Sequence, residues 1–279
     1  MKRKEIPGDI VRALETAARI VNDAERVKVS GPLRLGIDLG TSDIVSMAID
    51  ESNQPVAVCL EWADVVRDGV VLDFYGAAKI VREQLDTLEK KLGFRFSHVN
   101  TSYPPGTDPR ISVNVLEAAE LEVDSVIDEP SAVAELLSLD RAAVVDIGGG
   151  TTGVAVLQKG KVVYSGDEAT GGRHVSLTIA GHKRIPFAEA EAFKIAHGRE
   201  AWTIVRPVFE KMADITRAHL KGYDVTSLYL SGGSCTLPGV QPLFQEEFPD
   251  YQVILPKHPI YLTPLAIASG RDGGRHAGA

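Results

Sequence analysis

Two glycine-rich turns, each preceded by an aspartate, are the residues of this sequence best suited to chemistry. The first comprises Asp38-Leu39-Gly40-Thr41-Ser42, and the second comprises Asp146-Ile147-Gly148-Gly149-Gly150-Thr151. Glycine permits positive φ and the close approach of an anion, so the backbone N–H groups of such a turn can hold phosphate. A single turn of this kind is most often a plain hairpin with a capping aspartate. Two matched turns favour a phosphate site that is built from both sides.

Each turn also combines an acid with a hydroxyl. Asp38 and Asp146 end the apolar runs before the turns, and Thr41 and Thr151 follow the glycines. Mg²⁺ prefers oxygen ligands and keeps several of its waters, so the two carboxylates would hold, through water, an ion that neutralises nucleotide phosphates. The threonine hydroxyls would donate hydrogen bonds to phosphate oxygens. These residue types predict a site for a nucleotide with Mg²⁺.

A third glycine turn follows another apolar run. It comprises Leu230-Ser231-Gly232-Gly233-Ser234, and Pro238 after it suits the first turn of a helix. Its two glycines would let a flat ring or a sugar approach the backbone. Alone, this turn would indicate little.

The elements that must position these turns fall into two similar series. From residue 33, strand-like runs at 33–39, 44–50 and 55–61 precede alternating helical and strand patterns. The series restarts with strand-like runs at 142–147 and 152–158. Asp38 and Asp146 occupy the same place in the two series. A repeat of this length predicts two related α/β domains.

These patterns divide the chain into four parts. We expect an N-terminal helix with its connector at 1–32, one lobe at 33–140, a second lobe at 141–270 and a flexible tail at 271–279. The spacing of Ile10, Leu14, Ala18 and Val21 indicates an amphipathic helix, which would cap its own domain or dock on a partner. The tail, rich in glycine and charge, offers too little apolar surface to offset its ordering entropy.

Composition excludes several classes of function. The 279 residues carry 38 acidic and 30 basic side chains, a formal charge of −8, which argues against nucleic acid as a partner. Cys59 and Cys235 form neither a disulfide framework nor a zinc-binding pair, and Cys235 is expected to be a small buried thiol. No apolar stretch is typical of a signal peptide or a membrane span. We expect a cytoplasmic protein.

The motifs resemble those of the actin/Hsp70/sugar-kinase ATPase superfamily. Gly36–Thr41 and Val145–Thr151 are similar to its two phosphate motifs, and Leu230–Ser234 is similar to its adenosine motif. Asp128–Ala132 and Pro264–Gly270 are similar to its two connecting helices. All five motifs occur in order across nearly the whole chain. The resemblance implies a two-lobed α/β fold of the actin/Hsp70 type, with duplicated ribonuclease-H-like domains and a nucleotide cleft between them.

Within the superfamily, the sequence resembles the ethanolamine-utilisation protein J family. The segments Trp62–Gly69, Pro104–Ile111 and Asp167–Gly172 carry this likeness. The resemblance implies a bacterial, Hsp70-like protein of ethanolamine utilisation that binds ATP or ADP with Mg²⁺. It also implies association with the ethanolamine microcompartment.

The resemblance assigns roles to particular residues. Asp38 and Asp146 would position Mg²⁺, Glu129 would orient the attacking water, and Thr151 would complete the catalytic residues by donating to a phosphate oxygen. The remaining residues would bind the nucleotide: Gly40, Thr41, Ser42, Gly148, Gly149, Gly150 and Thr151 its phosphates, Gly171 and Gly172 its middle, Glu191 and Lys194 its ribose, and Gly232, Gly233 and Ser234 its adenosine end. Catalysis would consist of positioning and charge neutralisation for in-line phosphoryl transfer.

Two positions depart from the Hsp70 pattern. Gly153 stands where Hsp70 has an aspartate, which removes a carboxylate from the ion site. No motif anchors the catalytic lysine of Hsp70, although Lys79 lies in roughly the right stretch. A slow Mg-dependent ATPase, or a nucleotide that acts as a structural ligand, follows from these departures.

Three functions remain open at the level of sequence. The first is an ATP-dependent chaperone or reactivating factor whose clients would be ethanolamine ammonia-lyase or microcompartment proteins. The second is an actin-like polymerising protein, because Arg67–Asp73 and Asp128–Pro130 also resemble bacterial actin homologues. The third is a small-molecule kinase on the same fold. The sequence leaves the oligomeric state and the client undetermined.

Overall fold

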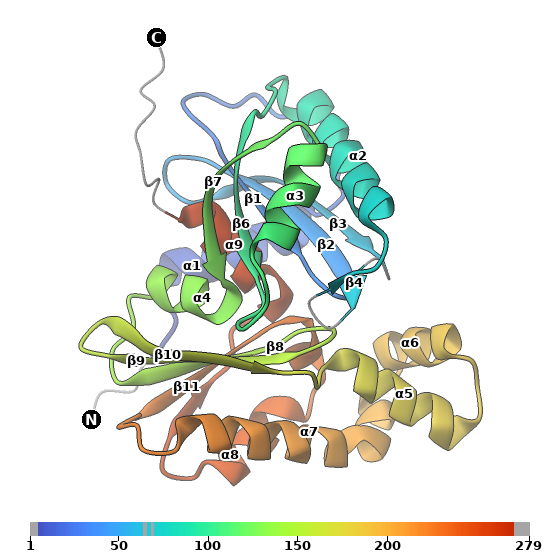
Figure 1. Ribbon diagram of the computed structural model, residues 1–279, viewed down its shortest axis with the longest axis vertical. Helices are drawn as coiled ribbons and strands as arrows, with labels where there is room; N and C mark the ends of the chain where they lie inside the picture. The colour runs from blue at the N-terminus through green and yellow to red at the C-terminus, as the bar shows by residue number, and fades with distance from the viewer. Residues whose placement is uncertain (1–4, 64–65, 68–69, 271–279) are drawn as a thin grey trace.

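The computed structural model describes residues 5–63, 66–67 and 70–270. Two sheets, each flanked by helices, lie one above the other in Figure 1, with helices α4 (Glu129–Leu136) and α9 (Leu262–Ser269) between them. The predicted tail at 271–279 and part of the Trp62–Gly69 segment lie outside the described residues.

The first lobe is built on a mixed five-stranded sheet with the order β3-β2-β1-β6-β7. Its strands are β1 (Arg34–Leu39), β2 (Asp43–Ile49), β3 (Pro55–Trp62), β6 (His98–Tyr103) and β7 (Glu122–Asp128). The first three strands pair antiparallel, whereas β6 and β7 pair parallel on the other side of β1. Helices α2 (Phe74–Leu92) and α3 (Arg110–Ala118) cover one face, and a two-stranded ribbon of β4 (Val66–Arg67) and β5 (Val70–Val71) lies at the end of β3.

The second lobe repeats this arrangement with the order β10-β9-β8-β11-β12. Its strands are β8 (Ala142–Ile147), β9 (Thr152–Gln158), β10 (Lys161–Glu168), β11 (Ser227–Ser231) and β12 (Gln252–Ile254). Its helices are α5 (Gly172–Lys183), α6 (Phe187–Ala196), α7 (Gly198–Leu220) and α8 (Val240–Glu247), with short 3₁₀ turns η1 (Gly233–Thr236) and η2 (Pro259–Tyr261). The matching strand orders confirm the predicted duplication and the two-lobed α/β fold.

Helices α4 and α9 pack against each other, α9 packs on the first sheet, and α4 contacts strands of both sheets. Gly36 on β1 allows α9 to approach the strand closely, because a Cβ at position 36 would lie 2.5 Å from the backbone nitrogen of Ala268 in α9. Helix α4 begins directly after β7, where the carboxylate of Asp128 accepts a hydrogen bond from the backbone N–H of Ser131. Both helices therefore run outward from the cleft between the lobes.

The N-terminal helix α1 (Gly8–Ile20) lies on β3 of its own chain. Its apolar face, formed by Ile10, Ala13, Leu14 and Ala17, is fully buried in the core that α4 and α9 share. The helix therefore packs as part of the body, which was one of the two arrangements that its amphipathic pattern allowed.

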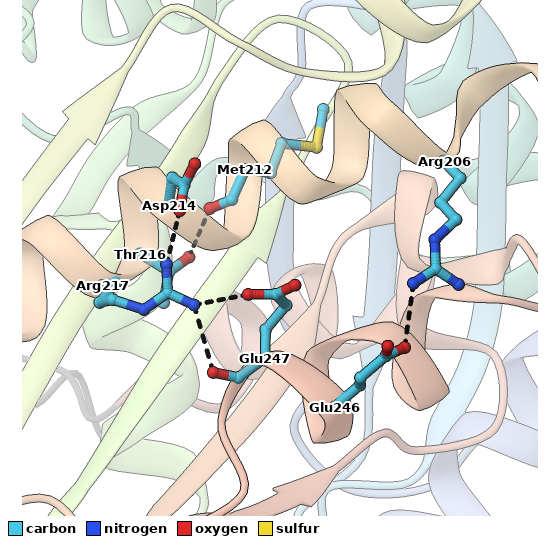
Figure 2. A network of polar contacts seen from close by, with 7 residues as sticks. All are labelled: Arg206, Met212, Asp214, Thr216, Arg217, Glu246 and Glu247. Atoms are coloured by element: carbon cyan, nitrogen blue, oxygen red, sulfur yellow. Dashed lines mark hydrogen bonds and ion pairs between the residues drawn. The ribbon is translucent and has the colours of Figure 1, made fainter.

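At the base of the second lobe, ion pairs join α7 to α8 (Figure 2). Arg217 donates to the Glu247 carboxylate at 2.6 Å and also pairs with Asp214, while Arg206 pairs with Glu246 at 3.0 Å. Exposed pairs of this kind are worth about 1 kcal/mol or less each. These ion pairs hold α7 and α8 together, and none of their residues lines the cleft between the lobes.

Within the part of the chain that the structure describes, no helix combines the length and the apolar character needed to cross a membrane.

Candidate functional site

The two predicted phosphate turns meet face to face between the lobes. A Cβ on Gly149 would lie 2.1 Å from Oγ of Ser42, and one on Gly150 would lie 2.6 Å from Oγ1 of Thr41. Real Cβ contacts are never this short, so only glycine lets the second turn lie against the first. The glycine run therefore serves the contact between the lobes as well as any ligand.

A cavity of about 50 Å³ separates the turns, and four carboxylates line it. Asp38 ends β1, Asp43 begins β2, Glu129 begins α4 and Asp146 lies near the end of β8. Burial, and then the charges of Asp43 and Asp146, raise the pKa of Asp38 to about 7. Burial and Asp146 raise the pKa of Asp43 to about 6, against the opposing effect of Lys194.

The pKa values of the other two acids, Asp146 and Glu129, are raised as well. Burial raises the pKa of Asp146, and burial followed by the charges of Asp38 and Asp146 raises the pKa of Glu129 well above its usual value. Like charges that are desolvated together disfavour ionisation, and a cation among them restores it. The cluster is thus suited to a hard cation with oxygen ligands, which is the character of Mg²⁺.

Hydrogen bonds hold two of these carboxylates in place. Oγ of Ser102 on β6 donates to Asp38 at 2.8 Å, and Oγ1 of Thr263 on α9 donates to Asp146 at 2.5 Å. Ser231 in turn contacts Thr263 at 2.9 Å. Among the residues that the structure covers, no three acids, histidines or cysteines are close enough to ligate a metal directly. The donor set fits an ion that the carboxylates hold through its waters.

The glycine that replaces an aspartate has a carboxylate beside it. Gly153 on β9 pairs with Asp167 on β10, and Oδ1 of Asp167 lies 3.4 Å from the place of a Cβ on Gly153. Asp167 also contributes to the raised pKa of Glu129. Asp167 on β10 therefore supplies a carboxylate close to Gly153, the position at which the resemblance to Hsp70 implied that a carboxylate is missing.

The residues predicted to hold the middle of the nucleotide lie on the second-lobe side of the turns. A Cβ on Gly171 would lie 2.6 Å from the carbonyl carbon of Gly150, and the N–H of Gly172 donates to the carbonyl of Gly148 at 2.9 Å. Glu191 and Lys194 on α6 form an ion pair at 2.8 Å, and Nζ of Lys194 also reaches the carbonyl of Gly172. The positive charge of Lys194 lowers the pKa of Asp43 in the carboxylate cluster.

The third glycine turn packs against the end of β8. Gly232 has a φ of +90°, and a Cβ there would lie 2.5 Å from Oδ1 of Asp146, so this position requires glycine. Oγ of Ser234 donates to the carbonyl of Gly148 at 2.8 Å. A second cavity of about 540 Å³ opens here, and Gly233, Ser234, Glu191 and Lys194 are among its lining residues.

The two cavities adjoin. Five residues line both of them: Ser42, Asp43, Gly149, Gly233 and Ile260. A ligand with a charged end and a flat end would place the charged end between the turns and the flat end in the larger cavity. The predicted site residues thus line one continuous cleft, except Gly171, which packs against the backbone of Gly150 and Thr151.

Several residues of the cleft escaped the sequence analysis. Asp43 could have been noticed, because an acid follows the first turn directly. Ser102 and Thr263 come from a distant strand and helix, and no local pattern marks them. Asp167 begins a segment that carries the family likeness, but nothing in that segment assigned it to the cleft. Val21, Asn22 and Trp62, which line the larger cavity, were likewise missed.

Two residues considered from the sequence lie away from this chemistry. Lys79 is on the exposed face of α2, where it pairs with Glu83 at 3.7 Å, so it is not the lysine of the cleft. Cys235 is buried beside β11, and its thiol donates to the carbonyl of Ser231 at 3.0 Å. Burial raises the pKa of this thiol, which makes it a poor nucleophile, as expected.

Comparisons with known proteins agree with this geometry. The family model of cell division protein FtsA matches residues 143–266. "Ethanolamine utilization protein EutJ" of Escherichia coli (strain K12) is 62% identical over 260 residues, covering 93% of each chain. The crystal structure of ethanolamine utilization protein EutJ from Carboxydothermus hydrogenoformans has a TM-score of 0.84 and 42% identity, covering 92% of this chain and 98% of that one.

A more distant structure shares the fold. MreB5 of Spiroplasma citri, solved bound to ADP, has a TM-score of 0.66 with 16% identity, covering 84% of this chain and 94% of that one. At this level of identity, the likeness concerns the fold alone.

Proposed function

Because the chain belongs to the ethanolamine utilization protein EutJ family, we propose that it serves ethanolamine utilisation by binding ATP and ADP with Mg²⁺ between its two lobes. One observation carries the proposal. The two glycine turns face each other around the carboxylates of Asp38, Asp43, Glu129 and Asp146, whose raised pKa values call for a cation. The same fold in MreB5 of Spiroplasma citri is bound to ADP, which supports this choice of ligand.

Each part of the cleft would have a distinct task. Backbone N–H groups of residues 40–42 and 149–151 would bind the β- and γ-phosphates, whereas the N–H of Gly148 already donates to the carbonyl of Thr151 at 3.1 Å. Asp38 and Asp146, oriented by Ser102 and Thr263, would hold the hydrated Mg²⁺, which supplies charge neutralisation when bound. Glu129, at the start of α4, would orient and deprotonate the attacking water, because its raised pKa suits a general base. Catalysis would therefore depend on positioning and electrostatics.

Titration calorimetry tests nucleotide binding directly. MgATP and MgADP are titrated into the wild type, into Asp146→Asn and into Asp250→Asn, an exposed aspartate far from the cleft. We expect the wild type and Asp250→Asn to bind alike, and Asp146→Asn to bind at least about 10-fold more weakly, as for loss of about 1.4 kcal/mol. The proposal is wrong if the wild type binds neither nucleotide at millimolar concentration.

We further propose that the protein is an Hsp70-like chaperone or reactivating factor that works beside the ethanolamine microcompartment. The family points to ethanolamine ammonia-lyase or microcompartment proteins as clients. Closure of the lobes on ATP would change the outer ends of α4 and α9, because both helices contribute residues to the cleft.

The client is tested with ethanolamine ammonia-lyase that has lost activity during turnover. We expect recovery of activity with MgATP and the wild-type protein, and no recovery with Glu129→Gln. If the lyase does not recover activity but shell proteins are captured in a nucleotide-dependent way, the client is a microcompartment protein instead of the lyase. Failure of both would refute the chaperone proposal while leaving nucleotide binding intact.

Actin-like polymerisation is the second candidate, because Arg67–Asp73 and Asp128–Pro130 resemble bacterial actin homologues. It predicts ATP-dependent light scattering above a critical concentration. A constant monomer or small oligomer across the micromolar range, with and without MgATP, would exclude this function.

A further inference from the structure

Part of the lining of the larger cavity comes from the N-terminal segment, which precedes both repeated lobes. Val21 and Asn22, directly after α1, line it from one side, next to Leu60 and Trp62 at the end of β3. The opposite side belongs to the second lobe and includes Ile195. The N-terminal segment is therefore part of the cleft surface.

Hydrogen bonds fix this segment to the edge of the first sheet. The N–H of Asn22 donates to the carbonyl of Val58 at 2.9 Å, and Val21 forms an isolated parallel bridge with Val58. The Asn22 side chain bonds both backbone groups of Leu60, since Nδ2 donates to its carbonyl and Oδ1 accepts from its N–H, each at 2.9 Å. Residues 21 and 22 thus pair alongside the edge strand β3, and these hydrogen bonds hold them in place.

The helix before them anchors the segment further. Its buried face packs on β3, η2 and α9, and Glu15 pairs with Lys257 at 3.2 Å just before η2. Ile260 and Tyr261 of η2 line the same cavity. The wall at Val21 cannot move without disturbing the packing of α1.

The cavity is apolar on two opposite sides. One group consists of Val21 of the N-terminal segment with Leu60 and Trp62 of the first lobe, and the other consists of Ile195, Leu237 and Pro238 of the second lobe. Trp62 is 58% exposed and Ile195 is 66% exposed, although both are large apolar side chains. A flat aromatic ring between them would remove this surface from water.

We infer that Val21, Asn22 and Trp62 form the wall against which the base of the bound nucleotide stacks. The inference rests on the proposed nucleotide binding and deepens it. The wall contributes shape and apolar contact, because the Asn22 amide is already engaged by Leu60. The N-terminal helix thereby becomes a positioning element of the nucleotide site.

The variant Val21→Trp tests this wall, because its indole would fill the space of the base. Val27→Trp is the matched control, since Val27 lies on the same connector, is 38% exposed and does not line the cavity. The ligands are ATP, ADP and inorganic tripolyphosphate, all with Mg²⁺, measured by calorimetry. Tripolyphosphate needs only the two glycine turns.

We expect Val21→Trp to weaken ATP and ADP by about 10-fold or more while tripolyphosphate binds within about twofold of wild type. Val27→Trp should match the wild type for all three. Unchanged ATP affinity in Val21→Trp, or equal weakening of ATP and tripolyphosphate, would overturn the inference. Absence of binding of any of the three to the wild type would instead defeat the proposed function itself.

A second measurement needs no substitution in the N-terminal segment. The fluorescence of Trp62 should change when the wild type binds ATP but not tripolyphosphate, and Trp62→Phe should abolish the change. The other tryptophan, Trp202, packs on Phe209 inside the second lobe. An equal response to ATP in Trp62→Phe and wild type would show that the base does not reach this wall.

Discussion

At the scale of single residues, the carboxylates of the cleft make the stability of the ligand-free protein depend on pH. Asp38 and Asp43 have folded-state pKa values raised to about 7 and about 6. A carboxyl group with a raised pKa binds its proton more tightly in the folded chain, so stability falls as pH rises from about 4 towards 7. Each pKa unit is worth about 1.4 kcal/mol before solvent screening reduces it.

We therefore predict that Asp43→Asn is more stable than the wild type at pH 8 and that this advantage shrinks towards pH 5. The comparison between variants cancels the effects of groups outside the cleft. Thermal unfolding without nucleotide, at unit steps of pH, measures the difference. A difference in melting temperature that does not vary with pH would contradict the assigned pKa values.

The second prediction at this scale concerns Glu129. If Glu129 activates water, Glu129→Gln should lower ATP turnover by about 100-fold or more, because the amide cannot accept the proton. The dissociation constant for MgATP should change by less than about threefold, since an amide keeps the size of the side chain. Single-turnover hydrolysis and calorimetry separate the two effects. Equal losses in binding and turnover would assign Glu129 to binding instead.

At the scale of elements, the approach of α9 to β1 depends on one glycine. A Cβ on Gly36 would lie 2.5 Å from the backbone of Ala268, whereas nothing lies within 4 Å of a Cβ on Gly181 in α5. Gly36→Ala should therefore destabilise the protein by about 1–3 kcal/mol through overpacking. Gly181→Ala should be neutral or stabilising by about 0.5–1 kcal/mol, because alanine favours the helix.

Urea unfolding of the two glycine variants provides the measurement. Because Thr263 of α9 also bonds Asp146, displacement of α9 by Gly36→Ala should weaken MgATP binding as well. Wild-type stability in Gly36→Ala would show that α9 can shift freely from β1.

At the scale of the whole molecule, a ligand that contacts both lobes in the cleft would stabilise both lobes against unfolding. The two glycine turns follow strands of different sheets, and residues of both lobes line each cavity. At a ligand concentration 100 times the dissociation constant, binding adds about 2.7 kcal/mol to the free energy of unfolding. We predict that MgATP shifts the unfolding of both lobes together to a higher temperature.

Differential scanning calorimetry with and without MgATP tests this coupling. Asp146→Asn serves as the control, and its transition should move much less. Two transitions of which only one responds to MgATP would show that the ligand contacts a single lobe.

The glycine turns, the duplication and the two-lobed fold could all be predicted from the sequence. Glycine turns after apolar strands are local patterns, and a repeated series of elements remains visible along the chain. The predicted domain boundaries and the individual roles of the site residues stay predictions. The prediction was possible where adjacent residues alone specify a turn, as in the glycine run of Gly148–Thr151.

The distant residues that complete the cleft could not be predicted, because the folding of the chain selects them. Asp167 beside Gly153, Thr263 on Asp146 and Asn22 on Leu60 are contacts between residues far apart in sequence. Side chains of these types occur throughout the chain, and no local pattern marks the few that converge. Strand pairing and the packing of α1 and α9 select them, because those contacts form only when the two sheets are brought together.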